Sequence, residues 1–152
     1  MFFTSKRPTI QTAVAAEWLA ILDSAAAAAL LTTPVVELFI SGPPLTGNDV
    51  YANYKPCTFA GYLPAQLKLN KAGNLLNGDQ ARTAPAYFEV TAGNISDESA
   101  LGYLVSDGAA KIYMAEFFPS PVPFSAPGDF LDLDVIWPVS ISPIFAVQNL
   151  SS

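Results

Sequence analysis

The densest group of carboxylates in the chain lies near its C-terminal end, at Asp129, Asp132 and Asp134. Hard cations such as Ca²⁺ prefer several oxygen ligands, so these side chains are candidates for a calcium site. Asp132 and Asp134 are two residues apart and would share one face of a β-strand. The segment lacks the Asx and Gly loop spacing of calcium-binding sites. We therefore favour a solvated strand face and expect no metal or cofactor, with these three aspartates as the residues to examine.

Residue types needed for nucleophilic catalysis are scarce. The sequence contains no histidine and a single cysteine, Cys57. A Ser-His-Asp triad, a Cys-His dyad, a His–Cys zinc site and an intramolecular disulfide are therefore excluded. Cys57 has no activating base nearby in sequence, which favours a small buried hydrophobe. The acidic pair Asp97 and Glu98 could serve a glycosidase, but such pairs arise by chance among 13 carboxylates. We predict that the protein is not an enzyme.

A loop rich in tyrosine and asparagine is the candidate binding feature. Tyr51, Tyr54 and Tyr62, together with Tyr87 further along the chain, could line a surface that binds a host glycan. Aromatic loops equally serve loop packing or subunit contacts. We keep Tyr51, Tyr54 and Tyr62 as a candidate ligand-facing loop, with packing as the alternative.

The composition limits the classes of partner. The 152 residues are 51% hydrophobic and 13% charged, with a net charge of −6. Ordinary soluble domains carry roughly 25% charged residues. This balance excludes intrinsic disorder and a nucleic-acid interface built on a basic patch. So few charges indicate that part of the surface is covered by other protein molecules.

The most apolar stretch, residues 13–40, does not resemble a membrane span. Glu17, Asp23, Pro34 and Glu37 interrupt it, whereas a spanning helix needs about 20 predominantly apolar residues. The same acidic residues interrupt any secretory signal. We expect no membrane span.

The N-terminal third of the chain should position an arm and a helix. Residues 1–8 are predicted to be an arm in which Phe2 and Phe3 dock on the same domain or on a neighbour. Residues 9–31 show apolar spacing typical of a buried helix that includes Trp18 and ends before Pro34. Residues 9–152 are expected to be a single domain.

The rest of the chain is predicted to be a β-sandwich over residues 35–142, followed by a tail over 143–152. β-branched, aromatic and alternating patterns indicate the strands. They are expected at residues 35–40, 57–63, 67–70, 87–91 and 129–137, with loops at 45–56 and 70–85. Leu131, Leu133 and Val135 should face the core together with Trp137. Prolines between residues 119 and 127 indicate an edge or a connector.

A hairpin is the clearest local prediction. Asp107-Gly108 favours a two-residue type I′ turn between residues 101–106 and 109–117. This turn would place Val105 opposite Ala110 and Tyr103 opposite Ile112. With the other elements, it predicts a mainly β fold, namely an antiparallel β-sandwich or jelly roll with an N-terminal α-helix.

Short segments around this hairpin resemble small β-rich virion structural proteins of phages and uncultured viruses. The resemblance is carried by residues 17–19, 36–39, 59–62, 101–108, 115–118, 121–122 and 126–129. It implies a non-enzymatic, capsid- or tail-associated subunit located in the virion, whose partners are other copies of itself and other virion proteins. A carbohydrate- or receptor-binding module of a phage tail or spike is the alternative. We expect the apolar ends of the chain, Phe2, Phe3, Ile144 and Phe145, to make the assembly contacts.

Overall fold

The computed structural model describes residues 1–5, 8–12, 35–66, 80–82, 86–91 and 97–138. These residues are mainly β, as predicted, with one short 3-10 helix, η1 (Tyr51–Asn53). The strands are β1 (Phe2–Thr4), β2 (Thr9–Ile10), β3 (Val35–Ser41), β4 (Lys55–Pro56), β5 (Ala65–Gln66), β6 (Gln80–Arg82), β7 (Ala86–Glu89), β8 (Glu98–Ser106), β9 (Ile112–Phe124), β10 (Phe130–Asp134) and β11 (Ile136–Pro138).

The largest sheet has six strands in the order β2-β9-β8-β3-β4, with β5 also paired to β3. All of these pairs are antiparallel. β3 is central, as its apolar sequence predicts, because β8 covers one edge while β4 and β5 cover the other. Val36, Leu38 and Phe39 are accordingly almost completely buried.

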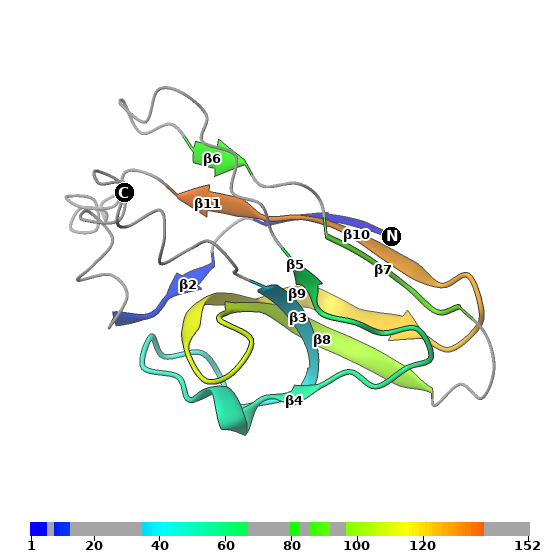
Figure 1. Ribbon diagram of the computed structural model, residues 1–152, viewed down its shortest axis with the longest axis horizontal. Helices are drawn as coiled ribbons and strands as arrows, with labels where there is room; N and C mark the ends of the chain where they lie inside the picture. The colour runs from blue at the N-terminus through cyan, green and yellow to red at the C-terminus, as the bar shows by residue number, and fades with distance from the viewer. Residues whose placement is uncertain (6–7, 13–34, 67–79, 83–85, 92–96, 139–152) are drawn as a thin grey trace.

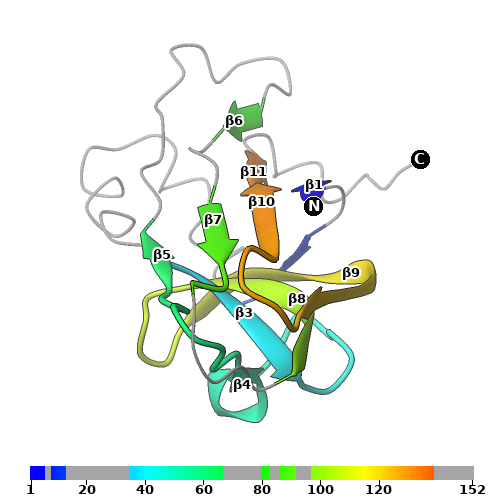
Figure 2. The ribbon, with the colours of Figure 1, turned by 90° about the vertical axis from the view of Figure 1, so that its right-hand side faces the viewer.

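A second sheet of three strands has the order β1-β10-β7 (Figures 1 and 2). β10 and β7 are antiparallel, but β1 runs parallel to β10, which corrects the prediction of an antiparallel fold throughout. Parallel pairing follows because the N-terminus joins this sheet as an extra edge strand rather than through a hairpin. Beyond Val135 the chain continues as β11, which pairs with β6.

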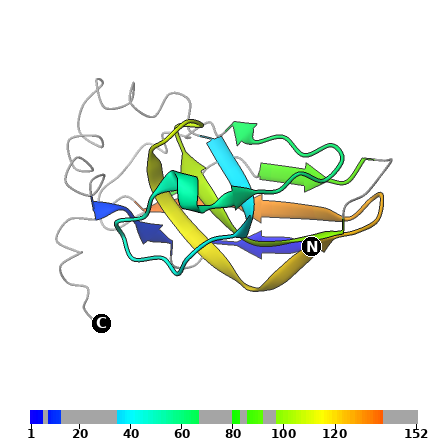
Figure 3. The ribbon, with the colours of Figure 1, turned by 90° about the horizontal axis from the view of Figure 1, so that it is seen from below.

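The two larger sheets pack over one hydrophobic core. β3 crosses the direction of β10 and β7 (Figure 3). A single buried cluster contains Leu131 and Leu133 from the three-stranded sheet and Leu38, Val105 and Phe124 from the six-stranded sheet. The predicted strand at residues 129–137 is confirmed as β10 and β11, and its leucines face the core as expected. The side chain of Trp137 is outside the described part of the structure.

The predicted hairpin is present, but its turn and register differ from the prediction. The loop holds five residues, Asp107 to Lys111, and Tyr103 lies opposite Glu116 rather than Ile112. Asp107 Oδ1 accepts the backbone N–H groups of Ala109, Ala110 and Lys111, each at 2.9 Å. By accepting these three N–H groups, the Asp107 side chain stabilises a five-residue loop in place of the two-residue type I′ turn that the Asp-Gly dipeptide favours.

The long strand β9 carries its prolines where one edge is open. β2 pairs with β9 only at Met114 and Ala115, so Pro119, Pro121 and Pro123 have no strand on that side among the described residues. Proline lacks the N–H that a second neighbour would need. The prediction of an edge is therefore confirmed, although as a continuous strand rather than a connector.

The predicted N-terminal helix is wrong at its start. Thr9 and Ile10 form β2 and pair with Ala115 and Met114, because these β-branched residues extend the edge of the large sheet. Gln11 N–H donates to Tyr113 O at 3.1 Å and continues the pairing. The predicted helix from residue 13 onward, including Trp18, lies outside the described residues.

Two other predicted elements also change. Residues 57–63 form no strand, because the chain turns at Ala60-Gly61, where Tyr62 N–H donates to Phe59 O at 2.9 Å and Gly61 has φ 89°. β6 lies within the predicted loop at 70–85. The strand at residues 87–91 is confirmed as β7 and its extension, and Phe88 and Val90 are both buried. The predicted strand at 67–70 and the tail at 143–152 lie outside the described residues.

Candidate functional site

Three aromatic side chains lie on the outer face of the three-stranded sheet. Phe2 on β1, Tyr87 on β7 and Phe130 on β10 alternate with buried neighbours, so their strands direct them away from the core. Phe2 is 76% exposed and Tyr87 is 53% exposed. We call these residues the aromatic trio.

The rings of the aromatic trio are in contact with one another. The centroid of Phe130 lies 5.6 Å from that of Phe2, with the rings at 77°, and 5.8 Å from that of Tyr87, with the rings at 22°. Both contacts are diagonal, since Asp132 is the residue opposite Phe2 and Tyr87 in the sheet register. The trio therefore forms a continuous aromatic surface across all three strands, in which Phe2 and Tyr87 are exposed and Phe130 between them is half-buried.

Carboxylates share this face with the aromatic trio. Glu89, Asp132 and Asp134 have the same alternation as Phe130 and are half-buried. Tyr87 OH donates to Glu89 Oε1 at 2.9 Å. This hydrogen bond, aided by the negative charges of Glu89 and Asp132, raises the pKa of Tyr87 above its usual value. The face therefore combines aromatic rings with negatively charged carboxylates.

The structure separates the two phenylalanines predicted as assembly contacts. Phe2 is exposed, as such a contact requires. Phe3 is only 8% exposed and packs edge-on against Phe118 at 5.0 Å, so its prediction as an assembly contact is wrong. Adjacent residues of a strand point to opposite faces, and only one of the pair can be outside. Ile144 and Phe145 lie outside the described residues.

The tyrosine hydroxyls of the predicted ligand-facing loop form hydrogen bonds within the protein. Tyr51 OH donates to both carboxylate oxygens of the buried Glu37 at 2.7 Å, and Ser106 Oγ donates to the same carboxylate at 2.7 Å. Burial and the bond to Glu37 raise the pKa of Tyr51 to about 12. This hydroxyl anchors the loop to the large sheet.

Tyr54 and Tyr62 are likewise structural. Tyr54 is 4% exposed, and its OH donates to Pro43 O at 3.0 Å. Tyr62 stacks beside Phe88 at 5.9 Å, while its hydroxyl accepts Leu38 N–H at 3.0 Å. These contacts support the packing alternative for the loop, and they leave Tyr87 as the exposed member of the four tyrosines.

The three aspartates considered for calcium do not converge. Asp129 Oδ2 accepts Ser125 N–H at 2.8 Å and Ala126 N–H at 2.9 Å, which closes the turn between β9 and β10. These hydrogen bonds hold the pKa of Asp129 below 3.8. Asp132 and Asp134 share a strand face, as predicted. Within the described residues, no group of three His, Cys, Asp or Glu side chains could hold a metal ion.

Cys57 is a buried thiol, as predicted from its neighbours. It is 2% exposed, and its N–H donates to Leu38 O at 3.0 Å. Burial, with a smaller contribution from the charge of Glu98, raises the pKa of the thiol to about 12. Glu98 itself accepts Thr58 N–H at 2.7 Å, which ties this loop to β8.

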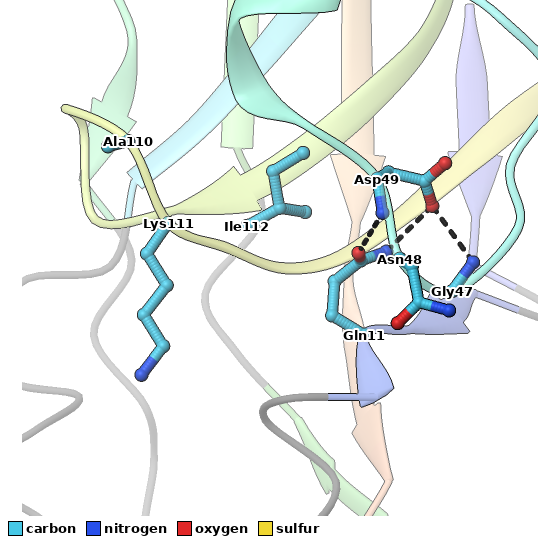
Figure 4. Close-up of a pocket in the computed structure, with 7 residues that line it drawn as sticks. All are labelled: Gln11, Gly47, Asn48, Asp49, Ala110, Lys111 and Ile112. Atoms are coloured by element: carbon cyan, nitrogen blue, oxygen red, sulfur yellow. Dashed lines mark hydrogen bonds between the residues drawn. The ribbon is translucent and has the colours of Figure 1, made fainter.

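A pocket of about 320 Å³ lies beside β2 (Figure 4). Its lining residues are Gln11, Gly47, Asn48, Asp49, Ala110, Lys111 and Ile112. Gln11 and Asp49 bind each other through two hydrogen bonds, at 2.9 Å and 2.6 Å. Asp49 Oδ2 also accepts Gly47 N–H at 3.0 Å. These polar groups close the loop onto β2, so the pocket offers less binding chemistry than the aromatic trio.

The sequence contained a signal for the aromatic trio that the loop tyrosines obscured. Phe130 has the same parity as Asp132 and Asp134, so the alternation that places Leu131 inside also places Phe130 outside. Tyr87 likewise alternates with the buried Phe88. What the sequence lacked was the pairing that brings β1, β7 and β10 together.

No family model, curated protein or solved structure matches this chain. In the described ranges, the structure has no helix long and apolar enough to cross a membrane.

Proposed function

We propose that the protein is a non-enzymatic structural subunit of a viral particle, located in the virion and associated with its capsid or tail. It assembles through protein–protein contacts with other copies of itself and with other virion proteins. The viral assignment is supported by the sequence resemblance around the hairpin. The aromatic trio, with Phe2 and Tyr87 exposed and Phe130 half-buried between them, is the observation that supports a contact surface.

An exposed aromatic surface of this kind favours a binding role. Aromatic residues are enriched at the centres of protein interfaces, where they bury much area at a small entropic cost. Monomeric soluble proteins rarely expose large contiguous apolar patches without a function. Within β1, Phe2 is exposed and Phe3 is buried. Of the two phenylalanines of the N-terminal arm, we therefore retain only Phe2 as a proposed assembly contact.

A jelly-roll winding is part of the same proposal. β7 pairs with β10 in one sheet, while the two strands between them, β8 and β9, pair in the other. A ribbon of paired strands folded across two sheets is the arrangement from which jelly rolls are built. The parallel strand β1 would then be an addition to this winding.

Carbohydrate or receptor binding is the second candidate function. We now place its proposed site on the outer face of β1, β10 and β7 rather than on the loop with Tyr51, Tyr54 and Tyr62. Tyr87 and Phe130 lie nearly parallel, at 22°, beside carboxylates that can accept hydroxyl hydrogen bonds. Glycan-array binding by the wild type that is lost in Tyr87→Ala and retained in Tyr51→Phe would support it.

Light scattering after size-exclusion chromatography tests the assembly proposal. We expect the mass of the wild type to rise with concentration, and the double variant Phe2→Ala/Tyr87→Ala to need at least about tenfold more protein for the same mass. Leu63→Ala is the matched control, because Leu63 is 75% exposed on a loop outside this sheet. A wild type that stays monomeric at high concentration and alongside other virion proteins would contradict the proposal.

A further inference from the structure

The outer face of the three-stranded sheet has a strong charge asymmetry. The strands β1, β7 and β10 read FFT, AYFE and FLDLD, and they contain three carboxylates but no lysine or arginine. The N-terminal ammonium of Met1 donates to Phe130 O at 3.4 Å and brings one positive group to this sheet. Among the described residues of these three strands, acidic side chains therefore outnumber basic ones beside the aromatic trio.

Asp132 is at the centre of this face. In the sheet register it lies between Phe2 on β1 and Tyr87 on β7. Glu89 accepts the hydroxyl of Tyr87, whereas no side chain in the described part of the chain donates to the Asp132 carboxylate. Asp132 thus offers a hydrogen-bond acceptor between two exposed rings.

These charges argue against a twofold contact in which this face of one copy meets the same face of a second copy. A twofold contact would bring three carboxylates from each copy into one apolar interface, and like charges placed opposite each other destabilise an interface. A cation gains instead from both features, since aromatic faces attract cations and carboxylates pair with them. Arginine fits better than lysine, because its planar guanidinium can stack on a ring while forming a forked bond with a carboxylate.

We propose that the outer face of β1, β10 and β7 binds an arginine-bearing segment of a partner protein. The guanidinium groups stack on the aromatic trio and pair with Asp132. This inference rests on the proposed function, because it assumes that the face is a protein contact, and it adds the chemistry of the partner.

Isothermal titration of the full chain with model peptides tests this inference. The probe is a hexapeptide of alternating glycine and arginine, and the comparison peptide carries uncharged citrulline in place of arginine. We expect only the arginine peptide to bind, with an affinity that falls as salt is raised. Tyr87→Ala and Asp132→Asn should each weaken binding by about two- to fivefold, the range for exposed cation–π contacts and ion pairs.

Matched controls separate a specific site from general attraction to an acidic protein. Asp97→Asn removes one exposed charge outside this sheet, and Leu63→Ala removes an exposed apolar side chain, so both should leave binding unchanged. Equal loss in Asp97→Asn and Asp132→Asn would overturn the proposal, as would equal binding of the citrulline peptide or no binding at all. Binding of cellopentaose that needs Tyr87 but not Asp132 would assign the face to neutral glycans instead.

Failure of the arginine-binding inference can be distinguished from failure of the assembly proposal. If the arginine peptide does not bind but Phe2→Ala/Tyr87→Ala still impairs assembly, the face is a protein contact for another kind of partner. If neither effect is seen, both proposals fail.

Discussion

Replacing either of two adjacent phenylalanines should affect folding stability very differently. Phe3 is 8% exposed and contacts Phe118 edge-on at 5.0 Å, whereas Phe2 is 76% exposed. Truncating a buried phenylalanine to alanine costs about 3–5 kcal/mol, from lost apolar burial and the cavity left behind. β1 has only three residues and lies at the edge of its sheet, so the lower end, about 3 kcal/mol, is expected for Phe3→Ala. Phe2 buries about a quarter of its surface, and Phe2→Ala should cost less than about 1 kcal/mol.

Urea unfolding followed by tryptophan fluorescence measures this difference. With a slope of about 2 kcal/mol per molar urea, Phe3→Ala should lower the midpoint by about 1.5 M and Phe2→Ala by less than about 0.5 M. Both variants must be compared at the same low protein concentration, because assembly would stabilise the wild type. Equal shifts, or a larger shift for Phe2→Ala, would refute the assignment of Phe3 to the core and Phe2 to the surface.

Three further substitutions and one labelling experiment test the fold. Gly102→Ala should destabilise the protein by about 1–3 kcal/mol in thermal unfolding, because an added Cβ would lie 2.3 Å from Glu116 O. Tyr103→Phe should cost about 1–3 kcal/mol, since its buried hydroxyl donates to Glu116 Oε1 at 2.9 Å; an unchanged melting temperature would contradict this. Cys57 should react with a thiol reagent at pH 8 only after unfolding, because burial raises the pKa of its thiol to about 12; fast labelling of the native protein would show that it is exposed. The pKa of Asp129 is held below 3.8 by backbone N–H donors, so its contribution is present above that pH and lost as pH falls through the folded-state value. Asp129→Asn should therefore be less stable at neutral pH and show a shallower acid loss, measured as melting temperature against pH.

Strands could be predicted where their own residues indicate which faces are buried. Residues 35–40 are apolar on both faces except at Glu37, and residues 130–134 alternate strictly between leucine and an outward residue, so both patterns specify their surroundings. The assignment of Leu131 and Leu133 to the core followed from this alternation and is confirmed by their burial.

Features decided by distant partners were not predictable. Thr9 and Ile10 fit a helix period as well as a strand, and the edge of β9, more than 100 residues away, decides between them. The hairpin register depends on how many N–H groups Asp107 accepts, which the dipeptide Asp-Gly does not specify.

The candidate site shows the same limit. Tyr51 and Tyr54 were plausible ligand contacts until the structure placed Glu37 and Pro43 at their hydroxyls. Phe2, Tyr87 and Phe130 are far apart in sequence, and only the β1-β10-β7 pairing brings their rings together. Whether an aromatic side chain is exposed depends on which other parts of the chain pack against it. A single sequence carries little information on such distant contacts.

Oxidative footprinting of the chain in its assembled and dissociated forms tests the central claim most directly. Hydroxyl radicals label exposed aromatic side chains, so a contact surface becomes protected when the interface forms. We predict strong protection of the exposed Phe2 and Tyr87 on assembly, weaker protection of the half-buried Phe130, and unchanged labelling of Leu63 on its exposed loop. Equal labelling of the aromatic trio in both forms would contradict the claim that this sheet face is the contact surface.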